Sequence, residues 1–485
     1  MTTASICVTG GKPTKPTETW CCATARTRTA RKITTWAPAT LLPRSTAPAR
    51  SPAIRPITAS NLFVISARSI KRKSMNRIRC LLKSVSIASL CWETAVSAWA
   101  QGSLTPPGAP APTFRTLDQI ETRTPITNLP FTISQPGSYY LTQSLIFPGE
   151  TTEGITVQAS DVVIDLMGFT LEGSSPAVGI EAESSYTHLT VQNGHLTGWR
   201  IAIMAIGNNY VFQNLRISGC GKGIETAAQA VVADCQVVNN DNQLDSFSGI
   251  YVGNYSSVRH CIVGNNRGAA GWTARAITVG AYSLVNDCLA YDNVVEESPG
   301  LYGISAGSNS RISDCIVRNG HREGITAQSR CSIQDCTSSD NVTGIKTYFS
   351  SLIERCTTTQ CASNGIWVGT RCQVIGCEVS QNLYQGLSVS GDGNRIENNN
   401  CSSNASSGIF VFDDDNRIEG NHVFANDYGI YLRYWGEADK ADRNLVLRNS
   451  AHQNRSENYH VGSGNFVAPI DSTGAFTSDS ANYSF

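Results

Sequence analysis

The chain has 485 residues, and its 38 Lys and Arg are balanced by 38 Asp and Glu. This balance hides two unlike parts, because residues 1–74 carry thirteen basic and one acidic residue, whereas residues 101–485 carry twenty-two and thirty-six, a net charge near −14. The acidic part argues against nucleic acid or an anionic membrane as the main partner, since either would favour a basic surface. The length allows several ordinary domains or one long repeat array.

The N-terminal 100 residues are predicted to precede the mature protein. Residues 1–74 are rich in Thr, Ala, Arg and Pro without apolar periodicity, which predicts a disordered basic region. We interpret it as upstream sequence read as protein; a functional basic tail is the alternative. A signal peptide is predicted over 75–100, with Met75 as the true start, a basic segment, a short apolar stretch at 84–92 and a small-x-small cleavage site ending at Ala100. The apolar stretch is too short for a membrane span, so we expect an exported protein, in the periplasm, at the cell surface or outside the cell.

A Pro-rich linker follows at 101–115. From residue 154 a small residue followed by Ile or Leu recurs, and seven of the twelve steps are 20 to 22 residues long. These small residues are Gly154, Gly179, Ala202, Gly223, Gly249, Ala276, Gly303, Gly324, Gly344, Gly365, Gly386, Gly408 and Gly429. Such a period indicates a repeat architecture.

Each repeat predicts short strands and no helix. Segments such as "GIYVG" and "GIWVG" alternate between apolar and other residues, a second apolar segment such as "SVRHCIV" follows, and an Asn, Asp and Gly-rich turn closes the unit. One unit is too small to bury a core, but stacked units can pair each strand in parallel with its equivalent in the next coil. The predicted fold class is all-β, a parallel β-helix of about 13 coils and roughly 60 Å.

Seven cysteines lie twelve residues after the small residue of their repeat: Cys235, Cys261, Cys288, Cys315, Cys336, Cys356 and Cys377. In stacked coils they form one ladder, which Gln192 and Asn214 are expected to continue on one side and Asn399 and Asn421 on the other. We favour buried free thiols. Disulfides between neighbouring rungs and a metal site are the alternatives, but parallel side chains are poorly oriented for the S–S torsion, and zinc needs four ligands around one point. Cys331 and Cys372 share another offset, two coils apart.

Three phrases carry a resemblance to a known group: "PITNLPFTISQPGSYYLTQSL" (125–145), "GITVQASDVVIDLMGFTLEG" (154–173) and "VQNGHLTGW" (191–199). They resemble the opening of exported bacterial right-handed parallel β-helix proteins of the pectate-lyase-like superfamily, and "NYHVGSGNFVAPIDSTG" is similar to their tail. The resemblance covers about 115–485. It implies a right-handed coil, an N-terminal cap with the first strands at 116–153, the β-helix at 154–450 and a tail packed on it at 451–485.

The resemblance implies less about activity. Enzymes of the superfamily act on polysaccharides, but the site motifs of polygalacturonases, alginate epimerases and pectate lyases are not reproduced in order in this sequence. Fold does not imply function, so no catalytic residue is carried over.

Three longer repeats suggest a binding wall. Their extra residues fall in the same turn and give adjacent loops at 240–248, 266–275 and 292–302. Per-repeat insertions often form the binding face of a solenoid, although surface loops also lengthen at little cost. The wall would present Asp245, Trp272, Arg275, Glu296, Glu297 and Tyr302.

Beside this wall, alternation places one residue per coil on the outer surface. We name these the central row: Tyr251, Thr278, Ser305, Thr326, Lys346, Trp367, Ser388, Phe410 and Tyr431. Exposed aromatic rings in line suit the apolar faces of sugars, although such a ladder also stabilises a sheet by itself. Carbohydrate-binding candidates are therefore Tyr251, Trp272, Arg275, Glu296, Glu297, Tyr302, Lys346, Trp367, Phe410 and Tyr431.

Candidates for chemistry are weaker. His321, Arg322 and Lys346 lie within two coils and are candidates for β-elimination on an acidic polysaccharide, which needs a base and a cation. The pair Glu296 and Glu297, or Asp413 to Asp415, are candidates for hydrolysis. No cofactor is expected, with Ca²⁺ on Asp413, Asp414 and Asp415 as the exception. The leading hypothesis is an exported protein that binds a polysaccharide on a lateral face; a polysaccharide lyase or glycoside hydrolase and a structural, adhesin-like rod are the alternatives.

Overall fold

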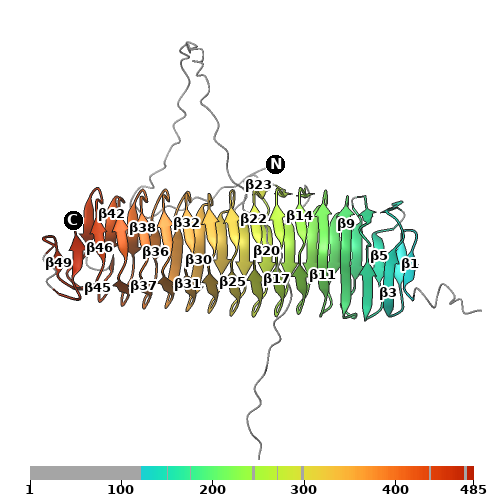
Figure 1. Cartoon of the computed structure of the whole chain (residues 1–485), viewed down its shortest axis with the longest axis horizontal. Helices are drawn as coiled ribbons and strands as arrows, with labels where there is room; N and C mark the ends of the chain where they lie inside the picture. The colour runs from blue at the N-terminus through green and yellow to red at the C-terminus, as the bar shows by residue number, and fades with distance from the viewer. Residues whose placement is uncertain are drawn as a thin grey trace, which may run out of the picture. The chain divides into compact units, whose positions relative to one another are not determined.

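The computed structural model describes residues 122–149, 151–174, 176–242, 246–269, 271–295, 300–435, 439–474 and 478–485. These residues form a parallel β-solenoid whose coils stack along one axis, from β1 at one end to β49 at the other (Figure 1). All their regular elements are strands, and none of them forms a helix able to cross a membrane. The predicted leader segments at 1–74, 75–100 and 101–115 lie outside the described residues.

Each coil contributes a strand to each of three faces. Face 1 is a sheet of 15 parallel strands. Its strands are β2 (Phe131–Ile133), β5 (Glu153–Val157), β8 (Val178–Ala182), β10 (Ile201–Ala205), β12 (Lys222–Thr226), β16 (Ser248–Val252), β20 (Ala274–Val279), β24 (Leu301–Ala306), β27 (Glu323–Ala327), β30 (Thr343–Phe349), β33 (Ile366–Thr370), β36 (Leu387–Val389), β39 (Ser407–Val411), β42 (Tyr428–Leu432) and β47 (Glu457–His460). Thirteen of these strands belong to the repeats predicted from the sequence; β2 and β47 extend the sheet at its two ends.

Faces 2 and 3 are joined by β9 (Leu189–Thr197) and β11 (Val211–Ser218), which run through both. Face 2 also contains β1 (Thr124–Ile126), β3 (Gly137–Leu141), β6 (Val162–Asp165), β13 (Val231–Ala233), β17 (Ser257–Arg259), β21 (Leu284–Asn286), β25 (Arg311–Ser313), β28 (Ser332–Gln334), β31 (Leu352–Glu354), β34 (Gln373–Ile375), β37 (Arg395–Glu397), β40 (Arg417–Glu419), β45 (Leu445–Leu447) and β48 (Phe466–Val467). Face 3 contains β4 (Leu145–Ile146), β7 (Thr170–Glu172), β14 (Gln236–Val238), β18 (Ile262–Gly264), β22 (Leu289–Tyr291), β26 (Ile316–Arg318), β29 (Thr337–Ser339), β32 (Thr357–Thr359), β35 (Glu378–Ser380), β38 (Asn400–Ser402), β41 (His422–Phe424), β46 (Ser450–His452), β49 (Ile470–Asp471) and β50 (Asn482–Ser484).

The expected N-terminal cap at 116–153 is described from residue 122, and it already consists of the strands β1 to β4 and the start of β5. In the tail at 451–485, β47, β48 and β50 pair in parallel with the coil before them. This tail therefore continues the solenoid. A short antiparallel pair, β43 (Tyr434–Trp435) and β44 (Asp439–Lys440), lies outside the three faces.

The repeated small residue is required by the contact between coils. A Cβ built on Gly303 would lie 2.4 Å from the Gly324 carbonyl oxygen and 2.4 Å from Val317 Cγ1, and one on Gly249 would lie 2.5 Å from the Ala276 carbonyl oxygen. The Ile that follows points into the core, where Ile250, Ile304 and their equivalents are fully buried. The Gly-Ile pair thus marks a point of close contact between coils.

The cysteine ladder is confirmed. The seven thiols from Cys235 to Cys377 are free and buried, and each donates to the backbone carbonyl oxygen two residues earlier. Toward the C-terminus Asn399 and Asn421 continue the ladder as predicted, since the Cys377 backbone N–H donates to Asn399 Oδ1 and Asn399 Nδ2 donates to Asn421 Oδ1.

The predicted continuation toward the N-terminus was wrong. Strand register pairs Arg216 with Gln236, so Leu215 occupies the rung before Cys235, and Leu215 is in turn paired with Gly194. Gln192 lies two residues before Gly194, and Asn214 lies one residue before Leu215. The reason is that β9 and β11 run on without the corner that separates the strands of later coils, which changes the spacing between apolar residues.

Two further interior columns follow the other corners. One runs through Ser256, Ser283, Ser310, Cys331, Ser351, Cys372 and Asn394, which places Cys331 and Cys372 two coils apart as expected. The other contains Cys220, Asn240, Asn266, Asn293, His321, Asn341, Cys361, Asn382, Asn404, Asn426 and Asn454. In both, each side chain satisfies backbone groups at a turn.

Candidate functional site on face 1

The central row exists as predicted. Strand register pairs Tyr251 with Thr278 and continues through Lys346, Trp367 and Tyr431, one residue per coil. The row extends beyond the predicted residues to Glu225 on one side and His460 on the other. Equivalent outward positions of successive coils therefore lie next to one another along face 1.

Exposure along the row is uneven. Tyr251 is 42% exposed, but Thr326 and Ser388 are 5% and 1% exposed, although alternation had placed them in solvent. Both side chains are short and have a larger neighbour in an adjacent coil, which is Lys346 for Thr326. Trp367 and Phe410 flank Ser388. The large side chains thus form the outer surface of the row.

The predicted wall is a built structure. The long loops contribute β15 (Asp241–Asn242), β19 (Arg267–Gly268) and β23 (Val294–Val295), which pair as a separate three-stranded parallel sheet. Beneath it Phe247, Ala274 and Leu301 form a small hydrophobic cluster of their own. Trp272 is 53% exposed on this wall. The predicted Asp245, Glu296 and Glu297 lie outside the described residues.

Two predicted wall residues belong to face 1 itself. Arg275 lies on β20 and Tyr302 on β24, and register aligns both with Glu323 in a second outward row beside the central one. Glu323 was not predicted, because the sequence argument followed only the residue after each Gly-Ile pair. The alternation also applies to the residue before the pair, and that signal would have found it.

A cavity of about 420 Å³ opens where the wall meets this face. Tyr251 and Arg275 line it together with Glu225, and Met204 and Ile206 supply an apolar surface. The structure therefore brings together two of the predicted binding residues, one aromatic and one cationic. Such a combination of apolar lining and a few polar groups is typical of ligand sites.

Lys346 forms a second cluster further along the row. Its Nζ lies 2.7 Å from Glu323 Oε1 and 5.3 Å from the ring centres of both Tyr348 and Trp367. Partial burial acts to lower the pKa of Lys346, but the hydrogen bond and charge of Glu323 outweigh it and raise the pKa. Lys346 therefore stays protonated at neutral pH, which suits binding a carboxylate and not abstracting a proton.

The aromatic residues at the C-terminal end of the row stack on each other. The ring centres of Phe410 and Tyr431 are 5.0 Å apart with an interplanar angle of 11°, and those of Tyr431 and His460 are 4.4 Å apart at 14°. Because these ring faces are in mutual contact, the structure supports the alternative in which the ladder stabilises the sheet.

The proposed elimination group is not assembled. His321 is fully buried in an interior column, where Nδ1 donates to Asn341 Oδ1 at 3.0 Å and Nε2 accepts from Asn293 Nδ2 at 3.3 Å. Burial lowers the pKa of His321 to about 4. Arg322, the next residue, is exposed. His321 is thus separated from the surface on which Lys346 lies, because it replaces one asparagine of the column.

The three aspartates form a turn held by arginine. Arg443 donates to Asp415 Oδ1 at 2.8 Å and to Asp414 Oδ2 at 3.0 Å. Burial and the nearby Asp392 raise the pKa of Asp413. Among the described residues no group of three or more His, Cys, Asp and Glu side chains is arranged to hold a metal ion.

Comparison with known proteins gives one family match. Residues 282–468 match the model of the family described as periplasmic copper-binding protein (NosD). This segment covers eight of the parallel strands of face 1, from β24 to β47. The described residues form a parallel β-helix, in agreement with the predicted fold class. No curated protein sequence matches it.

Several solved structures are similar to this β-helix at low sequence identity. The mannuronan C-5 epimerase AlgE4 A-module of Azotobacter vinelandii is 12% identical, with 69% of this chain and 91% of that chain covered and a TM-score of 0.34. The periplasmic alginate epimerase AlgG is 12% identical, with 66% and 77% covered and a TM-score of 0.34. A mannuronic acid specific polysaccharide family 6 lyase from human gut microbiota is 11% identical, with 73% and 82% covered and a TM-score of 0.36.

Proposed function

We propose that this protein is exported and binds a polysaccharide along face 1, beside the wall. The observation that carries the proposal is the cavity of about 420 Å³ at the foot of the wall, where Tyr251 and Arg275 meet an apolar surface. Tyrosine offers a ring for the C–H face of a sugar, and arginine offers a fork of donors for hydroxyl or carboxylate oxygens. Export is supported by the signal-peptide pattern at 75–100 and by the periplasmic family that the chain matches.

The extended row makes a polymer a better fit than a single sugar. From the cavity, face 1 continues through Ser305 and Lys346 to Trp367 with one outward residue for every coil. Coils repeat about every 4.8 Å, so these five steps from Tyr251 span about 24 Å. Lys346, held protonated beside Glu323, supplies a cation for an acidic sugar at the far end of this stretch.

Binding is favoured over catalysis by the state of the two candidate bases. His321 is inside the solenoid, and Lys346 has a raised pKa, so neither is available to take a proton from a substrate on this face. A lyase would also release unsaturated products, which absorb in the ultraviolet. We expect no such absorbance when the protein is incubated with pectin or alginate.

A glycan array tests the proposal, followed by titration calorimetry with the best ligand. We expect Tyr251→Ala and Arg275→Gln each to weaken binding by about tenfold, because each removes a direct contact in the cavity. Phe410→Leu is the matched control, since its ring is committed to the stack at the other end of the row. No retention of any glycan, or equal affinity of the cavity variants and the parent protein, would refute the assignment.

A further inference from the structure

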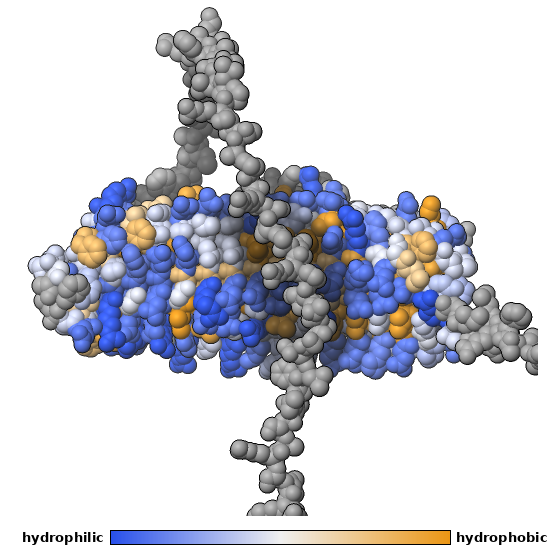
Figure 2. Space-filling view, viewed as in Figure 1, coloured by the Kyte–Doolittle hydropathy of each residue, from blue (hydrophilic) through white to orange (hydrophobic). Residues whose placement is uncertain are grey.

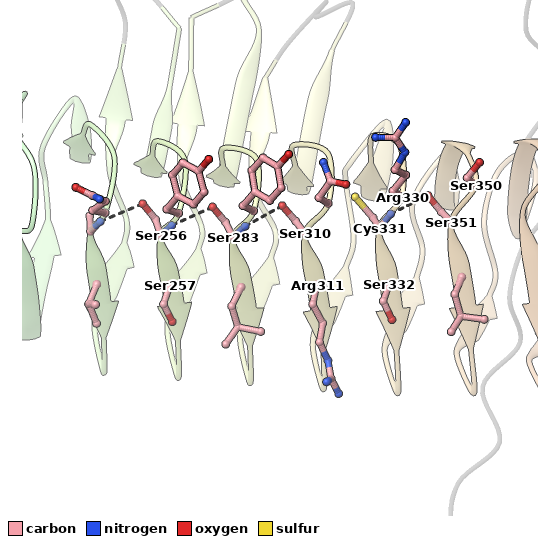
Figure 3. A pocket seen from close by; sticks show the side chains of 18 of the residues that line it. Ser256, Ser257, Ser283, Ser310, Arg311, Arg330, Cys331, Ser332, Ser350 and Ser351 are labelled. Carbon is pink, nitrogen blue, oxygen red and sulfur yellow. Dashed lines mark hydrogen bonds between the residues drawn. The ribbon is translucent and has the colours of Figure 1, made fainter.

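A groove of about 760 Å³ runs along the corner between faces 1 and 2, away from the wall. One rim carries the turn residues Tyr255, Tyr282 and Arg330, and the other carries Leu284 and Arg311 of face 2. Figure 3 shows Arg330 on the first rim and Arg311 on the second. The groove extends over seven coils, from Val231 to Gln373, or about 29 Å at 4.8 Å per coil. Its length suits a segment of a polymer.

The serine side chains on the floor of the groove already have hydrogen-bond partners within the protein. Ser256, Ser283 and Ser310 form the column marked by dashed lines in Figure 3, and the backbone N–H of each earlier residue donates to the next hydroxyl at 3.0 to 3.1 Å. The hydroxyl of Ser283 also donates to the Ala281 carbonyl oxygen. Because these groups are satisfied within the protein, recognition falls to the rims.

The charged side chains that line the groove are both cationic. The residues that line the groove include Arg311 and Arg330 but no Asp or Glu, although residues 101–485 carry a net charge near −14. Several other described arginines do pair with carboxylates, as Arg443 does with Asp415 and Arg455 with Asp427. The charge of Arg311 contributes to the lowered pKa of Asp335. The main partner of Asp335 is Arg355, which donates two hydrogen bonds to it.

Aromatic side chains complete the site. The rings of Tyr255 and Tyr282 stack at 5.1 Å with an interplanar angle of 8°, as those of Phe410 and Tyr431 do. Unlike that pair, which is only partly exposed, Tyr255 and Tyr282 remain 60% and 55% exposed and therefore still present ring surface to a ligand. Leu284, opposite Tyr282, is 39% exposed. Large exposed side chains with apolar surface often mark a binding site, and these match the C–H faces and edges of sugar rings.

We propose that this groove is a second carbohydrate site, specific for an acidic oligosaccharide whose carboxylates bind Arg311 and Arg330 and whose rings contact Tyr282 and Leu284. The acidic charge of the protein as a whole disfavours nucleic acid as the occupant, because long-range repulsion opposes a polyanion of that charge density. A uronic acid chain carries one charge per sugar, and it offers apolar ring faces as well. The site is separate from the face 1 cavity and does not depend on it.

The test is titration of the full-length protein with a hexamer of galacturonic acid and a hexamer of mannuronic acid at low salt. We expect at least one uronate to bind, and a neutral hexamer of glucose not to bind. Arg311→Gln and Arg330→Gln should each weaken uronate binding at least fivefold, and the double variant at least twentyfold. Added salt should weaken binding to the parent protein more than to the double variant.

Matched controls separate this groove from face 1. Arg455→Gln removes an exposed arginine far along the solenoid and should bind the uronate like the parent protein. Arg311→Gln and Arg330→Gln should have the same effect in a Tyr251→Ala background, in which the face 1 site is weakened. Absence of uronate binding, or undiminished binding by the double variant, would overturn the proposal. So would binding of single-stranded DNA or polyphosphate in preference to both uronates.

Discussion

Replacing His321 with asparagine is expected to remove a defined part of the acid sensitivity of the fold. His321 is fully buried between Asn293 and Asn341, and burial lowers its pKa from 6.5 to about 4. The unfolded chain therefore binds a proton between these pH values that the folded chain does not, so stability is present above pH 6.5 and is lost as pH falls toward 4. Below both values the loss reaches roughly 3 kcal/mol.

At pH 4.5 about 2.5 kcal/mol of this contribution is already lost relative to pH 7.5. Asparagine is the residue of the adjoining rungs, so His321→Asn should keep the column while removing the titration. Its smaller volume lowers stability equally at both pH values and cancels in the comparison. Urea unfolding of both proteins at pH 7.5 and 4.5, followed by far-ultraviolet circular dichroism, measures the difference.

The variant should lose about 2.5 kcal/mol less than the parent protein between the two pH values. His188→Asn is the control, because its side chain is 59% exposed and its backbone φ of 60° is one that asparagine tolerates. This control should stay within about 0.5 kcal/mol of the parent at each pH. An equal acid loss in His321→Asn and the parent protein would show that the buried imidazole does not titrate as argued.

Three further predictions concern the stacking of coils. Gly303→Ala should cost about 2 to 4 kcal/mol in urea unfolding, since its Cβ would lie 2.4 Å from the Gly324 carbonyl oxygen; a cost under 1 kcal/mol would contradict this close contact. Asn404→Ala should lower the free energy of unfolding by about 2 to 4 kcal/mol, because it leaves buried backbone groups of its column without partners. If the variant is as stable as the parent protein, the column does not contribute to stability. Burial raises the pKa of Cys401 and of Cys220 to about 12, so alkylation of the native protein at pH 8, mapped by peptide mass spectrometry, should leave both unlabelled until urea is added.

The sequence predicted the solenoid well because the repeat records the stacking itself. The small residue before Ile250 or Ile304 is where one coil meets the next, so its period gives the coil and its alternation gives the face. The wall could be predicted for the same reason, since insertions at one turn must become neighbours. These features depend on local spacing alone.

The site was harder to predict, because a linear pattern does not give depth or contact. His321 has the spacing of a turn residue, yet only the interior asparagine column shows that it is buried. Tyr282 and Arg330 lie at turns where non-glycine residues adopt a positive φ, and the neighbouring sequence does not predict a groove there. Alternation along the strands predicts that Phe410 and Tyr431 both point outward, but it does not show that their rings stack on each other.

The amide columns give the solenoid a direction. In the column from Cys377 onward, each asparagine Nδ2 donates to the Oδ1 of the asparagine in the following coil, until Asn482 turns its Nδ2 to the carbonyl oxygens of Val446 and Ala468. Asn482 therefore acts as a terminator, and a duplicated coil can lengthen the rod only if it is inserted upstream of that residue. Growth of such a protein, by evolution or by engineering, has to proceed from the middle outward with its last turn kept in place.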